Sequence, residues 1–138
     1  MKWLDCKCFK KYPDVAHLAL RLAAGVVFVA HGWQKWEGLT QFGGFLDSLG
    51  VPLPGLFAVV VMLVELVGGA ALIAGLFTHW AAKLLAIDML AAFFLVHVWN
   101  GVFVQNQGYE LVLMLFAASL VLMIEGAGKW SLDEKWRK

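Results

Sequence analysis

The chain has 138 residues, of which 62% are hydrophobic and 15% charged, and its mean hydropathy is +0.76. Soluble domains carry roughly 25% charged residues, and a domain of this size has no core large enough to hide so much apolar surface. The composition therefore excludes an ordinary soluble domain and predicts one integral membrane domain over residues 1–138. The net charge of +1 gives no indication of nucleic-acid binding.

Four apolar stretches are long enough, or nearly so, to cross a membrane as helices. A bilayer core needs about 20 apolar helical residues. The stretches cover about 15–36, 55–77, 80–100 and 109–125, and the last is the shortest. The breaker pair Pro52 and Pro54 separates the first two, and the alternation of a barrel strand is absent. The sequence predicts an all-α fold, a four-helix transmembrane bundle.

Two shorter segments outside these stretches also have helical patterns. Residues 40–50, TQFGGFLDSLG, place their large apolar side chains at helical spacing. Either a short interfacial or re-entrant helix or an ordered surface loop fits this pattern. In the tail, about residues 131–137, Ser131 precedes Glu134 by three positions, which is a capping-box pattern. We therefore expect a short amphipathic helix at the inner membrane surface.

Lysine and arginine are unevenly distributed between the two sides of the expected bundle. Four lysines lie in the first 11 residues, and three lysines and one arginine lie in the tail from residue 129. The connection after the first span holds only Lys35, and the connection GVFVQNQG after the third holds none. The positive-inside rule then places both termini in the cytoplasm. No secretory signal peptide is visible, so we expect the mature chain to begin at Met1.

Ionisable residues fall inside the predicted spans, where a charge costs roughly 2.5–3.5 kcal/mol. Four of them on the first span lie within a sector of about 80° at 100° per residue, and we expect this polar stripe to face the bundle interior. These four are His17, Arg21, His31 and Lys35. The later spans contribute Glu65, Asp88, His97 and Glu110.

The helical rise of about 1.5 Å per residue places most of these groups in the outer half of the bilayer, around a pocket that opens outward. The outer group is His31, Lys35, His97 and Glu110. Glu65 falls near the midplane, and Arg21 and Asp88 fall at similar depth in the inner half, where we expect them to pair. Asp88 and His97 are about 180° apart on a straight helix. They can both face one cavity only if the helix bends or if neighbours flank it on two sides. We therefore favour His97 as a site residue and treat Asp88 as mainly structural.

Plainer interpretations remain open for individual residues. The ammonium of Lys35 can snorkel to the interface, and Glu110 can be a charge at a helix N-terminus, stabilised by the helix dipole. Glu65 has no local partner, and Gly68 and Gly69 on its face allow close helix contact beside it. An intramembrane carboxylate of this kind indicates a functional residue.

The cysteines and the metal-binding residue types give weak signals. Cys6 and Cys8 do not have the spacing of common redox or zinc sites, and thiols on the cytoplasmic side stay reduced. Palmitoylation near the membrane is another interpretation. No local spacing of His, Cys, Asp or Glu supports a metal site, and none is predicted.

Several segments of the chain resemble the DoxX family of small membrane proteins. They are RLAAGVVFVAHGWQKW at 21–36, VELVGGAALIAGLFTHWAA at 64–82, the His97 region, GYELVLMLFAASL at 108–120, and GAGKWSLDE at 126–134. The resemblance implies a four-helix protein of the prokaryotic cytoplasmic membrane. Members are linked to thiosulfate:quinone oxidation and to oxidoreductase complexes that handle sulfur or oxidative stress. The family features carried over are Arg21, His31, Gly32, Lys35, Glu65, Gly68, Gly69 and Glu110.

The favoured hypothesis is a redox membrane subunit that binds a quinone in the polar pocket and works with a partner oxidoreductase subunit. His31 or His97 would hydrogen-bond the quinone, and Glu65 or Glu110 would deliver protons. The remaining ligand-binding candidates are Arg21, Lys35, Glu110 and Asp88. The alternatives are a proton-coupled carrier for an anion or small polar solute, which would need a homo-oligomer, and a purely structural membrane subunit.

Overall fold

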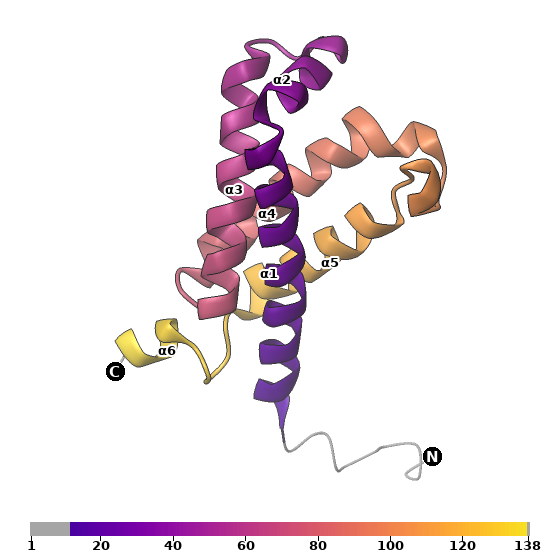
Figure 1. Cartoon of the computed structure of the whole chain (residues 1–138). Helices are drawn as coiled ribbons and strands as arrows, with labels where there is room; N and C mark the ends of the chain where they lie inside the picture. Colours follow the sequence, from indigo (N-terminus) through magenta and orange to yellow (C-terminus); the bar gives the residue numbers. More distant parts are fainter. Residues whose placement is uncertain (1–11, 138) are drawn as a thin grey trace, which may run out of the picture.

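The computed structural model describes residues 12–137, and this part of the chain is almost entirely helical (Figure 1). No strand occurs between these residues, so the predicted all-α class is confirmed. The helices are α1 (Pro13–Glu37), α2 (Leu39–Ser48), α3 (Pro54–Ala74), α4 (Thr78–Ala92), α5 (Glu110–Glu125) and α6 (Leu132–Trp136). A π-helical turn (Phe93–His97) and a 3-10 turn (Val98–Asn100) continue α4, and a second 3-10 turn (Val104–Asn106) lies in the loop before α5.

Three helical stretches in the described chain are long and apolar enough to cross a membrane. They are α1, α3 and the continuous stretch Thr78–Asn100. The apolar helix α5 has 16 residues, which at 1.5 Å per residue is about 24 Å, less than the roughly 30 Å of a bilayer core. Large apolar side chains stay exposed on all four long helices, as a surface in contact with lipid requires. Examples are Val26, Val67, Ile87 and Ile124.

Prolines and a glycine mark the ends of the long helices. Pro13 and Pro54 each lie in the first turn of a helix, where a missing N–H costs nothing because that group has no partner within the helix. Gly75 ends α3 in the left-handed conformation, with φ +67°, and its N–H donates to the carbonyl of Leu72 at 3.1 Å. The turn that follows sends the chain directly back into α4.

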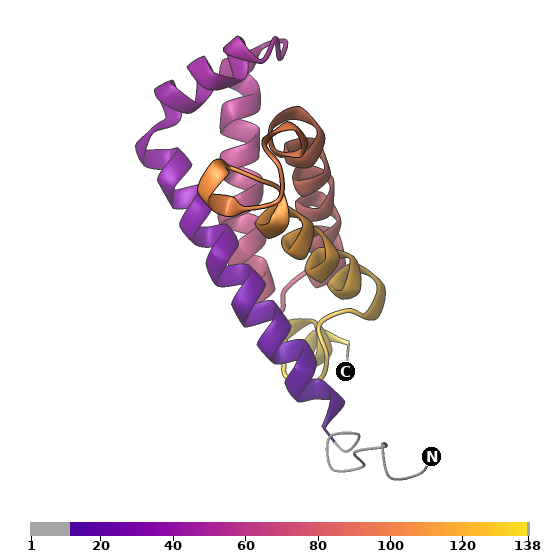
Figure 2. The same ribbon diagram turned by 90° about the vertical axis from the view of Figure 1, so that its right-hand side faces the viewer.

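The four long helices form two pairs. Figure 1 shows α1 lying along α3, while α4 and α5 run together at an angle to them, and Figure 2 shows the same pairs from the side. Glycines bring the backbones of α1 and α3 into contact: a Cβ on Gly32 would lie 2.6 Å from the backbone N of Leu66, and one on Gly69 would lie 2.8 Å from the carbonyl oxygen of Gly25. The α1–α3 pair is therefore tightly packed.

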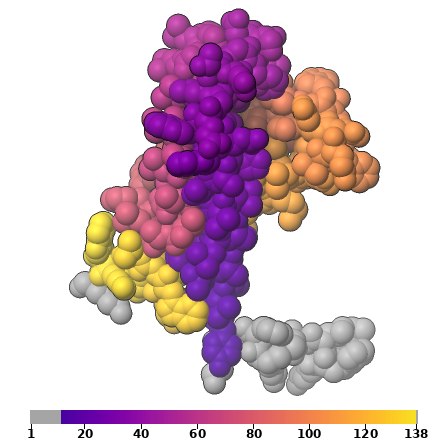
Figure 3. All heavy atoms as spheres, in the orientation of Figure 1, coloured from indigo at the N-terminus to yellow at the C-terminus, as the bar shows by residue number. Residues whose placement is uncertain are grey.

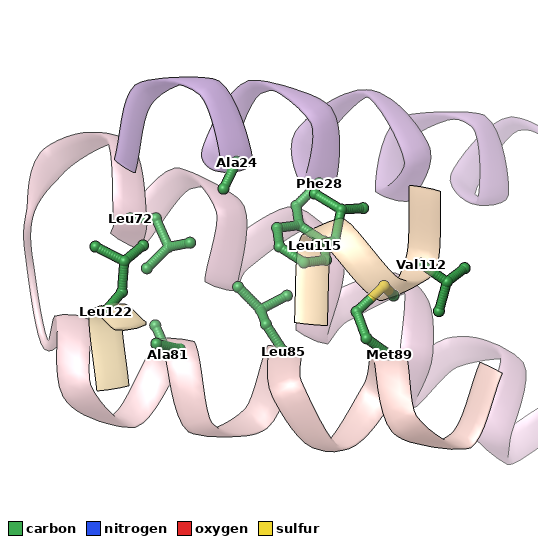
Figure 4. Close-up of a cluster of buried hydrophobic side chains, with 10 residues drawn as sticks. Ala24, Phe28, Leu72, Ala81, Leu85, Met89, Val112, Leu115 and Leu122 are labelled. Atoms are coloured by element: carbon green, nitrogen blue, oxygen red, sulfur yellow. The ribbon is translucent and has the colours of Figure 1, made fainter. Parts of the chain in front are cut away.

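A single cluster of buried apolar side chains joins the two pairs. Phe28 of α1, Leu72 of α3, Leu85 of α4 and Leu122 of α5 are fully buried and converge with smaller neighbours (Figure 4). Beyond this cluster the residues around 90–110 project to one side of the α1–α3 pair (Figure 3). The core therefore fixes how the four helices meet and leaves room between the pairs at their other end.

The two shorter segments are helical. Helix α2 covers most of residues 40–50, so the loop alternative for that segment is wrong. Helix α6 lies within the expected tail segment, and Ser131 Oγ accepts a hydrogen bond from the N–H of Glu134 at 3.2 Å, as the capping-box pattern predicts. Cys6, Cys8 and the N-terminal lysines lie outside the described residues.

Candidate functional site

A cavity of about 450 Å³ lies between the helix pairs, beyond the apolar cluster. Its walls come from α1, α2, α3, α4 with its π-helical turn, the loop before α5, and α5 itself. Most lining side chains are apolar. The polar lining residues are His31, Lys35, Glu65, Asp88, His97 and Gln107. This volume is within the roughly 300–1,000 Å³ typical of small-molecule sites. Apolar walls with a few polar groups are also typical of such sites.

Lys35 and Glu65 form an ion pair on the cavity wall. Lys35 Nζ, from the last turn of α1, lies 2.6 Å from Glu65 Oε2 on α3, and Glu65 is only 3% exposed. The ammonium also lies 5.3 Å from the centre of the Phe42 ring, within the range of a cation–π interaction. Lys35 therefore turns inward, and the alternative that it snorkels to the interface is wrong.

Asp88 and His97 line the same cavity, which the sequence allowed only for a helix that departs from the straight form or is flanked on two sides. The reason is the π-helical turn Phe93–His97, in which the wider i→i+5 hydrogen bonds rotate the residues that follow relative to a straight α-helix. The Asp88 carboxyl forms no hydrogen bond or ion pair with any described residue, and its Oδ2 is buried. Among the described lining side chains, it has the buried polar atom that lacks a hydrogen-bond partner.

The two histidines face the cavity from opposite helix pairs. His97 Nδ1 lies 2.6 Å from the carbonyl oxygen of Gln107. Because a carbonyl only accepts, Nδ1 carries the hydrogen, and Nε2 of the neutral ring is left with a lone pair. His31, on α1, is half-buried and has no hydrogen bond to another described residue. Two imidazole nitrogens or more are thus free to bind an occupant.

Arg21 is not on the cavity wall, and the expected Arg21–Asp88 pair is not formed. The Arg21 side chain is 1% exposed, and it donates to the carbonyl oxygens of Ala127 at 2.7 Å and Trp130 at 2.9 Å. It therefore fixes the segment after α5 against α1. Similar depth in the membrane suggested Asp88 as the partner of Arg21. The C-terminal tail instead returns to this end of α1, and no sequence pattern places its backbone carbonyls there.

Glu110 also lies off the cavity wall. It is the first residue of α5, and its Oε1 accepts a hydrogen bond from the N–H of Val104 at 2.6 Å. This position agrees with the alternative of a charge at a helix N-terminus. The carboxylate closes the loop that carries Gln107 and so shapes the cavity indirectly.

Asp133 has a structural role that the sequence did not reveal. Its carboxylate accepts hydrogen bonds from the backbone N–H groups of Phe77 at 2.7 Å and Thr78 at 2.8 Å, at the start of α4. It therefore caps that helix from 55 residues away in sequence. Local spacing gives no signal for such a distant cap.

The described side chains show no grouping of three or more His, Cys, Asp or Glu residues suited to a metal ion. The cavity wall instead has one cation, two carboxyl groups and two imidazoles. The cation is already neutralised by Glu65. This arrangement suits an uncharged occupant with hydrogen-bonding groups better than a free anion.

The fold and cavity define a small helical membrane protein with a mostly apolar cavity between its helices that carries a few polar groups. The DoxX family model matches residues 16–98, and the chain belongs to the DoxX family. It is a multi-pass protein of the prokaryotic inner membrane.

Relatives align over nearly the whole chain. The inner membrane protein YqjF of Escherichia coli is 30% identical over 92% of this chain and 99% of its own length. The uncharacterised membrane protein Rv3486 of Mycobacterium tuberculosis is 32% identical over 88% of this chain and 81% of its length. The protein named "Putative oxidoreductase CatD" from Bacillus subtilis is 30% identical over 87% and 86%. No solved structure matches the chain significantly.

Proposed function

We propose that this protein is a membrane subunit that binds a quinone head group in the 450 Å³ cavity and serves a quinone-linked oxidoreductase. The observation that carries the proposal is the cavity itself, with its mostly apolar wall and the few polar groups described above. A quinone head is flat, uncharged and has oxygen atoms to hydrogen-bond, so the residues present fit it. The name of the Bacillus subtilis relative favours a redox role.

The side chains of the cavity have separate roles in this proposal. The imidazole of His31 hydrogen-bonds a quinone carbonyl, and His97 Nε2, which is an acceptor, receives a hydrogen bond from a hydroxyl of the reduced quinol. The Lys35–Glu65 pair holds α1 to α3 and gives the wall a proton-exchanging group. Reduction of a quinone takes two electrons and two protons, and the electrons come from a partner oxidoreductase subunit.

The proposal includes four membrane crossings with both termini in the cytoplasm. Helix α5 crosses beside α4, and its short length is accommodated by local thinning of the bilayer. Two contacts support termini on one side: His17 Nε2 lies 2.7 Å from Glu125 Oε2, and the N–H of Lys129 donates to Asp14 Oδ1 at 3.1 Å. These contacts join the start of α1 to the end of α5.

An anion carrier would need a cationic side chain that is free to bind the anion, and neither Arg21 nor Lys35 is free. Arg21 is committed to backbone carbonyls away from the cavity, and Lys35 is paired with Glu65. An anion entering the cavity would have to compete with the Glu65 carboxylate for Lys35. A neutral ligand faces no such competition.

The test is native mass spectrometry with lipid extraction on mildly purified protein. Ala92→Phe would place a ring in the cavity, because Ala92 lines it, whereas Ala30→Phe adds the same ring at an exposed position of α1. We expect a stoichiometric quinone with the wild type and with Ala30→Phe, and its loss from Ala92→Phe. Wild-type protein without bound quinone, even after incubation with excess quinone, would contradict the proposal.

A further inference from the structure

The carboxyl group of Asp88 has a buried polar atom on the cavity wall that no other described residue satisfies. It lines the cavity, forms no hydrogen bond with a described residue, and has a buried Oδ2. Buried polar groups in native proteins almost always have a partner, and one without a partner calls for an explanation. A ligand in the adjoining cavity supplies that partner.

The other carboxyl groups near the cavity are already committed. Glu65 Oε2 lies 2.6 Å from Lys35 Nζ. Glu110, which does not line the cavity, accepts a hydrogen bond from the N–H of Val104 at 2.6 Å. As ionised carboxylates in these contacts, both are acceptors only, so neither can donate a hydrogen bond to a carbonyl oxygen of an occupant. Asp88 has no such contact with a described residue.

The charges on the wall determine how Asp88 binds. Lys35 is the only ammonium among the lining residues, and Glu65 neutralises it. With His31 and His97 counted as neutral rings, an ionised Asp88 would be an unpaired charge in a mostly apolar cavity, which proteins avoid. As a neutral acid, Asp88 has an O–H group to donate.

The π-helical turn places an acceptor on the same wall. It brings His97 to the cavity that Asp88 lines, and the bond from His97 Nδ1 to Gln107 leaves Nε2 as an acceptor. A donor and an acceptor on one helix are complementary to a ligand whose oxygens are carbonyls when it is oxidised and hydroxyls when it is reduced. Such π-helical turns are frequent at functional sites.

We propose that Asp88 is a ligand-binding residue that donates a hydrogen bond to a carbonyl oxygen of the oxidised occupant, while His97 Nε2 accepts one from a hydroxyl of the reduced form. This inference rests on the proposed quinone site and deepens it, because it moves the main carboxyl contact from Glu65 or Glu110 to Asp88. The ligand class is an uncharged compound whose oxygens alternate between carbonyl and hydroxyl forms.

The experiment measures the Kd of decylubiquinone and of a short-tailed menaquinone for the protein in nanodiscs. Asp88→Asn keeps a neutral donor of similar size, and Asp88→Leu keeps the size but removes the hydrogen bond. We expect Asp88→Leu to weaken binding about tenfold, as for the loss of one hydrogen bond, and Asp88→Asn to stay within about threefold. Asp47, exposed on α2 and off the wall, gives matched controls as Asp47→Leu and Asp47→Asn.

Each outcome has a distinct meaning when helical content and melting temperature match the wild type. Binding by Asp88→Leu as tight as by the wild type would overturn the role of Asp88 but leave the quinone site standing. Loss of binding in Asp88→Asn as large as in Asp88→Leu would show that a charged carboxylate, and not a donor, holds the ligand. Failure of the wild type to bind either quinone would instead refute the proposed function.

Discussion

At the scale of single residues, the cavity wall depends on one buried ion pair. Lys35 reaches from α1 to Glu65 on α3. The side chain of Lys35 is 19% exposed and that of Glu65 only 4%. Taking two charges out of water is costly, so such a pair is a weak source of net stability. Removing one partner, however, leaves the other charge buried and alone. The two charges are therefore best studied together.

Glu65→Gln should destabilise the protein by about 3 kcal/mol, because Lys35 is left without its counter-charge. The double variant Lys35→Met/Glu65→Gln should recover most of this loss, since no charge then remains unpaired. Equilibrium unfolding in mixed detergent micelles, arranged as a double-mutant cycle, measures the coupling free energy between the two residues. Additive effects of the two single changes would show that the pair contributes nothing to the fold.

At the scale of elements, the structure relies on close approach of helices and on contacts between distant segments. Glycines on one face of α1 and α3 let the backbones touch, and Asp133 of the tail caps α4. The glycine contact is readable from the sequence, because Gly68 and Gly69 lie beside Glu65. The cap joins positions 55 residues apart, so no local pattern indicates it.

Gly32→Ala should destabilise the protein by roughly 1–3 kcal/mol, as for overpacking in a tight core. The added Cβ would lie 2.6 Å from the backbone N of Leu66, which cannot move without separating α1 from α3. Gly44→Ala is the matched control, because that helical position has open space around it. It should stabilise the protein by up to about 1 kcal/mol through helix propensity. Equal effects in thermal unfolding would contradict the tight α1–α3 contact.

The sequence predicts the parts of the site that depend on spacing within one helix, and it does not predict those that depend on contacts between distant segments. Helical spacing and depth placed His31, Lys35, Glu65 and His97 toward one region, and the structure brings all four to one cavity wall. The sequence left the position of Asp88 open, since a straight-helix projection places it away from His97 and no pattern indicates the π-helical turn. It failed for Arg21, whose partners are backbone carbonyls of the tail.

At the scale of the whole molecule, the two ends of the described chain lie at the same end of the bundle (Figures 1 and 2). Arg21 holds the carbonyls after α5, and the carboxylate of Asp133 holds the turn between α3 and α4. The tail thus fastens both helix pairs at that end, while the cavity lies between them toward the other end. This asymmetry favours one closed end and one end that admits a ligand.

The closed end should face the cytoplasm, because Lys129, Lys135 and Arg137 of the tail lie there and positive charge is retained inside. Green fluorescent protein fused after Lys138 should fluoresce, and alkaline phosphatase at the same position should be inactive. Fused after Gly50, which follows α2 at the opposite end, the two reporters should behave in reverse. Active phosphatase at Lys138 would show either an odd number of crossings or an inverted bundle. The reporter at Gly50 separates these cases, since only an inverted bundle would place Gly50 in the cytoplasm.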